Sequence, residues 1–63
     1  MKIRFYVLNR DYEDFKNFVS QEKIKVINHF TINTNQIINH YIDCEIDGRK
    51  KKAYKREFRI LEA

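Results

Sequence analysis

Apolar and polar residues alternate along several stretches of this chain, and a period of two is typical of β-strands that bury one face. The clearest stretch is near the N terminus, where Ile3, Phe5 and Val7 are separated by more polar residues. Three further stretches of this kind lie at about residues 23–32, 36–47 and 52–61. A slip of one residue would turn a whole apolar set to solvent, so each pattern also predicts which side chains face the core.

One stretch follows a helical period instead. Its apolar residues are three or four positions apart, at Tyr12, Phe15, Phe18 and Val19. This spacing predicts a helix at about residues 11–22, with Asp11 as its N-cap and the apolar stripe in the core. The resulting order, β-α-β-β-β, predicts an α+β fold. We expect one domain over residues 1–63, with a mainly antiparallel four-stranded sheet and one helix on one face.

The second and third strands form a hairpin whose register follows from its apolar residues. Pairing Phe30 with Ile38 keeps the apolar residues together, and it brings Asn28 opposite His40 on the inner face. A helix of about twelve residues is ~18 Å long, whereas strands of about ten residues span ~33 Å. The helix therefore leaves Phe30, Ile32 and Ile38 uncovered, as a candidate protein interface. A homodimer or a strong bend of the hairpin would cover them equally well.

The last third of the chain predicts a second hairpin with a cationic tip. Pairing Cys44 with Tyr54 keeps the apolar faces together and leaves a loop at about residues 47–51. Six cations lie within eight residues at or beside this loop: Arg49, Lys50, Lys51, Lys52, Lys55 and Arg56. Cations that neutralise phosphates release counterions, and a two-stranded ribbon can enter a duplex groove, so the tip is a candidate nucleic-acid contact. The alternative is a solvated hairpin whose lysines discourage pairing between sheet edges.

The face of the sheet opposite the helix is predicted to carry aromatic residues among cations. Its candidate base-stacking residues are Arg4, Tyr6, Tyr41 and Arg59. Open sheets of this composition stack the bases of single-stranded nucleic acids in many binding proteins. The alternative is an ordinary apolar pair, because Tyr41 lies opposite Ile27 in the predicted register. The chain also lacks the glycine–aromatic signature of RNA-recognition sheets.

Residues with catalytic or metal-binding chemistry are few and scattered. Ser20 is the only serine, and no obvious base lies beside it. His29 and His40 are predicted to lie on opposite faces, without a Cys or carboxylate partner at the spacing of metal ligands. We therefore expect no enzymatic activity, no catalytic residue, no metal or other cofactor and no small-molecule substrate.

The composition favours a small binding protein. A net charge of +4 in 63 residues favours polyanionic partners. Cys44 is the only cysteine, and no apolar run is long enough for a signal peptide or a membrane span. We therefore expect a cytoplasmic protein with a reduced thiol and no membrane partner.

Three functions are compatible with these patterns. The leading hypothesis is non-catalytic binding of nucleic acid through the basic tip. The second is a small protein of phage or plasmid type that inhibits or adapts a host protein through its apolar sheet face or a sheet edge. The third is a structural subunit that forms homo-oligomers.

Overall fold

The structure is a computed structural model, and it describes residues 1–61 of the chain. With η denoting a 3-10 helix, its elements are β1 (Lys2–Leu8), η1 (Asn9–Asp11), α1 (Tyr12–Glu22), β2 (Lys25–Thr34), β3 (Ile37–Glu45), η2 (Gly48–Lys50), α2 (Lys51–Glu57) and β4 (Arg59–Leu61). The strands form one sheet in the order β2-β3-β1-β4, and every neighbouring pair is antiparallel. The predicted α+β class is confirmed, with a second α-helix in addition to the one expected.

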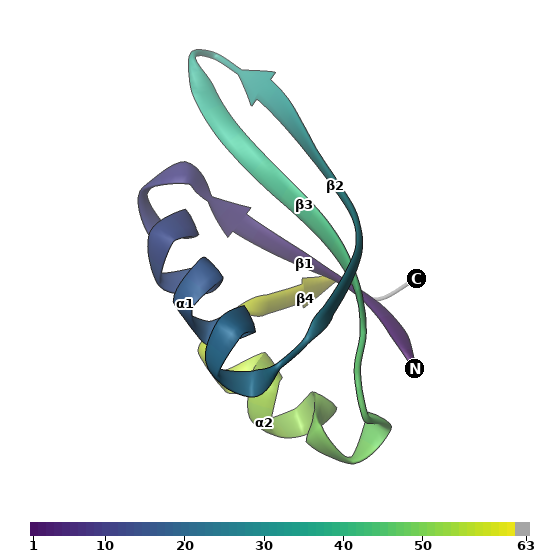
Figure 1. The fold of residues 1–63 in the computed structure, drawn as a ribbon. Helices are drawn as coiled ribbons and strands as arrows, with labels where there is room; N and C mark the ends of the chain where they lie inside the picture. Colours follow the sequence, from purple (N-terminus) through teal and green to yellow (C-terminus); the bar gives the residue numbers. More distant parts are fainter. Residues whose placement is uncertain (62–63) are drawn as a thin grey trace.

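The strands β1 and β3 form the centre of the sheet, and their register separates its two faces. Phe5 lies opposite Ile42, and the next pair along is Tyr6 opposite Tyr41. Because successive side chains of a strand point to opposite faces, these two pairs lie on opposite sides of the sheet. Phe5 and Ile42 are buried. Both α-helices lie on their side, which we call the inner face, and the side of Tyr6 and Tyr41 is the outer face (Figure 1).

Aromatic residues of α1 and α2 fill the core on the inner face. Phe15 of α1 is 2% exposed and packs edge-on against Phe5, with ring centroids 5.0 Å apart. Phe15 also meets Phe58 at 5.1 Å, and Phe18 meets Tyr54 of α2 at the same distance of 5.1 Å. The apolar stripe of α1 therefore lies in the core, as predicted.

The connections use residues with a left-handed backbone. Asn35 and Gln36 join β2 to β3 with φ angles of 51° and 67°, as a two-residue type I′ hairpin turn requires. Lys23 ends α1 with a φ of 53°. Asp11 occupies the predicted N-cap position of α1 but makes no capping hydrogen bond, because its backbone is helical rather than extended.

A β-bulge at Ile27 changes the faces of most of β2. Val26 lies opposite Cys44, but Asn28 lies opposite Asp43, so Ile27 is an extra residue in the ladder. Phe30 therefore pairs with Tyr41 on the outer face rather than with Ile38. The predicted register of this hairpin was wrong for two reasons: the turn lies at Asn35 and Gln36 rather than at residues 33–35, and the bulge interrupts a period of two that the prediction took as continuous.

The predicted second hairpin does not form, because Lys51–Glu57 is the helix α2. Every residue of this segment except Tyr54 is a strong helix former. Tyr54 and Phe58 are four residues apart, so both face the core from one side of the helix. The predicted pair of Tyr54 with Cys44 is therefore absent, and the short β4 pairs with β1 instead of β3. The order β-α-β-β-α-β with this sheet is the split βαβ arrangement, also called ferredoxin-like.

Two matched substitutions test the assignment of the faces. Phe15→Ala should lower the free energy of unfolding by about 3–5 kcal/mol, because Phe15 is fully buried. Phe30→Ala should cost no more than about half of that, since Phe30 is only partly buried on the outer face. Urea denaturation of both variants measures the difference. Equal losses would show that Phe30 belongs to the core and that the bulge is misplaced.

Candidate functional site

Three aromatic rings form a row across the outer face. Tyr6 of β1, Tyr41 of β3 and Phe30 of β2 lie side by side because they are in register across adjacent strands. The ring centroids of Tyr6 and Tyr41 are 5.3 Å apart, and those of Tyr41 and Phe30 are 5.2 Å apart with nearly parallel planes. We call these three residues the aromatic row. All three rings are partly exposed, so the row is open to a ligand.

Each end of the aromatic row carries an arginine. Arg59 of β4 pairs with Tyr6, and its guanidinium lies 5.6 Å from the centre of the Tyr6 ring. The guanidinium of Arg4 lies 5.1 Å from the centre of the Phe30 ring. Both distances are within the range of cation–π attraction. The structure therefore brings together all four predicted base-stacking residues and adds Phe30, which was predicted to lie on the inner face.

The two arginines differ in how much of their charge is available. Arg4 donates two hydrogen bonds to the carboxylate of Asp43, at 2.7 and 3.1 Å, and these bonds lower the pKa of Asp43. The ionised Asp43 offsets the charge of Arg4 and holds its planar fork in place. Among residues 1–61, no carboxylate forms an ion pair with Arg59. Arg59 is therefore the more available of the two cations.

A buried amide fixes the orientation of Tyr6. The Tyr6 hydroxyl donates to Oδ1 of Asn39 at 2.6 Å, and Asn39 is only 8% exposed. The amide nitrogen of Asn39 donates in turn to the carbonyl oxygens of Ile32 and Ile37 near the hairpin end. All polar groups of Asn39 are thus partnered, and the Tyr6 ring is held in place before any ligand arrives.

A groove with both apolar and cationic residues adjoins the aromatic row. It has a volume of about 840 Å³ and is lined by five apolar residues together with Lys2, Arg4, Asp43 and Lys51. Arg4 lines the groove and also contacts Phe30 of the aromatic row, so the two features are continuous. A chain that lies along the aromatic row can therefore place negative groups against the cations of this groove.

The six cations predicted for a hairpin tip lie instead on η2 and α2. Arg49 is held by the carboxylate of Asp47, with its Nη2 2.9 Å from Oδ2, and this contact lowers the pKa of Asp47. At about 100° per residue, the four cations of α2 fall within an arc of about 140° on one side of the helix. These are Lys51, Lys52, Lys55 and Arg56. The basic segment therefore presents a helical face rather than a ribbon tip.

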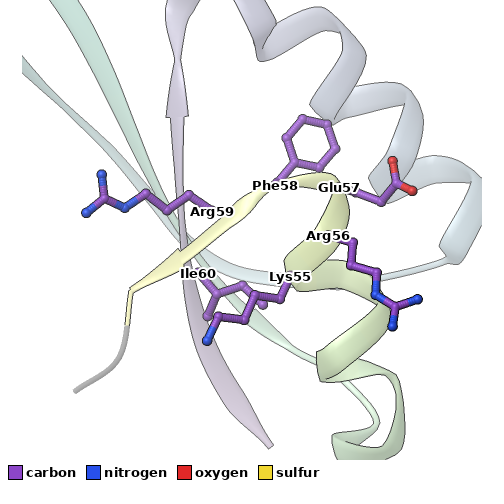
Figure 2. Close-up of a pocket in the computed structure, with 6 residues that line it drawn as sticks. All are labelled: Lys55, Arg56, Glu57, Phe58, Arg59 and Ile60. Atoms are coloured by element: carbon purple, nitrogen blue, oxygen red, sulfur yellow. The ribbon is translucent and has the colours of Figure 1, made fainter.

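A shallow hollow of about 410 Å³ lies where α2 joins β4, lined by residues 55–60. Figure 2 shows that Lys55, Arg56 and Arg59 extend from this junction in different directions, while Phe58 points toward the helices. The three cations do not converge on one point in the hollow. This junction therefore lacks the geometry to hold a single phosphate, and Arg59 serves the outer face instead.

The two histidines form a pair, which corrects the prediction that they lie on opposite faces. The bulge turns His29 to the inner face, where its Nε2 lies 2.9 Å from Nδ1 of His40. Nε2 of His40 lies 2.9 Å from Oδ1 of Asn9, and the Tyr12 ring stacks on His40 at 4.1 Å. Since Oδ1 only accepts, this network assigns the proton of neutral His40 to Nε2, and Nδ1 of His40 accepts from His29.

Other reactive groups are inert or isolated. Burial raises the pKa of Cys44 to about 11, so its thiol stays protonated at neutral pH. Within residues 1–61, no group of three or more His, Cys, Asp or Glu side chains could hold a metal ion. In the same part of the chain, no helix is long and apolar enough to cross a membrane.

The three residues predicted as one apolar interface lie on both faces of the sheet. Phe30 is on the outer face and partly buried, and Ile32 is on the same face with 45% exposure. Ile38 pairs with Asn33 and points to the inner face, where it is 39% exposed. The end of the β2–β3 hairpin projects past β1 and α1, as the length mismatch predicted (Figure 1).

Comparison of the chain with protein-family models, with curated proteins and with solved structures finds no significant match. The function must therefore be argued from the site itself.

The buried histidine gives a pH dependence of stability. Burial, followed by the nearby His29, lowers the pKa of His40 from its ordinary value of 6.5. The unfolded chain then binds a proton more readily than the folded one, so the free energy of unfolding should fall as the pH drops below about 6.5. Urea denaturation on both sides of that pH measures the effect. His40→Asn should flatten this dependence, and an unchanged slope in the variant would contradict the assignment.

Proposed function

We propose that the protein binds single-stranded nucleic acid on its outer face, with bases stacked on the aromatic row and phosphates near the surrounding cations. The observation that carries this proposal is the row itself. Tyr6, Tyr41 and Phe30 lie side by side on a helix-free face, with Arg4 and Arg59 at its ends. Base–aromatic stacking contributes about 1–3 kcal/mol per base and needs no base-specific hydrogen bond.

The position of the rings supports a single strand rather than a duplex. Tyr6 and Tyr41 lie on the two central strands of a four-stranded antiparallel sheet, with both α-helices on the other side. RNA-recognition sheets use aromatic residues on such an open face to stack two or three unpaired bases. The likeness is one of architecture only. Paired bases in a duplex would not expose their faces to the row.

The charge distribution supports an anionic ligand. The chain has a net charge of +4, and Arg59 lacks an ion-pair partner within residues 1–61. The guanidinium of Arg59 can stack on a base bound beside Tyr6, because Arg planes stack on bases as aromatic rings do. Lys2 of the adjoining groove supplies charge for the phosphates. Affinity should therefore fall steeply with salt.

A second candidate is an interface with a host protein at the end of the β2–β3 hairpin. Ile32 and Ile37 are 45% and 56% exposed, and both lie on the outer face. Neighbouring exposed apolar side chains of this kind favour protein contacts. This interface would serve the inhibitor or adaptor considered from the sequence, without any role for the aromatic row.

Fluorescence anisotropy with labelled single-stranded DNA and RNA oligonucleotides tests the leading proposal. At low salt the wild type should bind, and Tyr41→Leu should weaken binding about tenfold or more, because Leu has no ring on which a base stacks. Tyr12→Leu is the matched control on the inner face and should bind as the wild type does. No binding by the wild type, or equal affinity of both variants, would contradict the proposal.

The same assay separates the outer face from the basic helix. Changing Lys52 and Arg56 to Ser removes two cations from the outward side of α2. If they contact phosphates, the slope of affinity against salt should decrease by about one to two. The loss caused by Tyr41→Leu should be the same in this background. If the double change alone abolishes binding, α2 rather than the aromatic row is the binding element.

A further inference from the structure

The strand β2 is an unprotected edge of the sheet. It is ten residues long, nine of these residues are exposed, and residues 26–34 contain no Asp, Glu, Lys or Arg. In the whole chain 35% of residues are charged, so this stretch is unusual for its surface position. Natural edge strands are commonly shortened, charged, or covered, because their free backbone groups pair with other strands. The opposite edge, β4, has only three residues and includes Arg59.

We propose that β2 pairs antiparallel with β2 of a second copy of this chain, around a two-fold axis perpendicular to the sheet. The bulge at Ile27 lies near the start of the strand, so residues 28–34 form a regular ladder with β3 and leave a regular free edge. Identical edges are self-complementary in this arrangement. The proposal is independent of nucleic-acid binding.

The register of this pairing can be argued from the backbone. Residues of a strand alternately direct their N–H and C=O groups to one neighbour and then to the other. Two directly opposed residues in an antiparallel pair must either both direct these groups toward each other or both direct them away. Consecutive residues differ in this direction, so the two-fold axis of a symmetric pair must pass through a residue that lies opposite its own copy and not between two consecutive residues. The centre of the regular segment is Thr31. This axis gives four kinds of pair: Asn28 with Thr34, His29 with Asn33, Phe30 with Ile32, and Thr31 with Thr31.

The side chains favour this axis over its neighbours. An axis on Thr31 places Phe30 opposite Ile32 of the second copy twice, on the outer face, and pairs polar residues elsewhere. An axis on Phe30 places Ile32 opposite Asn28, and an axis on Ile32 places Phe30 opposite Thr34. The Ile32 axis does pair the two Ile32 side chains with each other, but only the Thr31 axis gives both Phe30 and Ile32 an apolar partner. Each Phe30 then contacts its own Tyr41 and Ile32 of the other copy.

Sedimentation equilibrium from low micromolar to submillimolar concentration tests the association. The wild type should shift from monomer to dimer as the concentration rises. Ile32→Lys should remain a monomer, because it places a charge against Phe30 of the second copy. Ile37→Lys is the matched control, since Ile37 is equally apolar and exposed on the same face but belongs to β3. A wild type that stays monomeric, or a dimer lost only with Ile37→Lys, would overturn the proposal.

Cysteine cross-linking tests the register. Thr31→Cys places two thiols directly opposite each other at the axis, within the distance that a disulfide spans. With oxidised glutathione, this variant should form a covalent dimer on a non-reducing gel, while the buried Cys44 does not react. Asn33→Cys should cross-link far less, because its opposite residue is His29. Equal cross-linking of both variants, or preferential cross-linking of Asn33→Cys, would overturn the Thr31 axis.

Discussion

The pairing of β1 with β3 is the constraint on which the rest of the structure depends. It places Phe5 opposite Ile42 on one face and Tyr6 opposite Tyr41 on the other. The first pair supplies the surface on which α1 and α2 pack, and the second supplies the centre of the aromatic row. A slip of one residue in this pairing would bury the tyrosines and expose the core. The core and the candidate site are therefore two results of one register.

The bulge at Ile27 is the second determinant, because it decides which residues of β2 join each face. One extra residue turns Phe30 to the outer face, where it extends the row, and turns His29 to the inner face, where it meets His40. The bulge thus places Phe30 beside another aromatic ring on the outer face and His29 beside another histidine on the inner face.

The sequence predicts some of this and not the rest, for reasons that lie in particular residues. The ladder between β1 and β3 contains no bulge, so a period of two predicted the outer-face positions of Arg4, Tyr6 and Tyr41. The bulge was missed because Val26 and Ile27 are both apolar, and either could continue the pattern. The helix α2 was missed because Tyr54 and Phe58 are four residues apart, a spacing that keeps one face in a strand and in a helix alike. The absence of β-branched residues from 51–57 was the available signal.

The central claim is that the outer face, centred on β1 and β3, is the surface that meets a single strand. The most direct measurement is an NMR titration of the ¹⁵N-labelled protein with a short single-stranded oligonucleotide at low salt. We expect the largest amide shift changes around Tyr6, Tyr41 and Arg59, and small changes along α1. Shift changes confined to η2 and α2, or no changes at all, would contradict the claim.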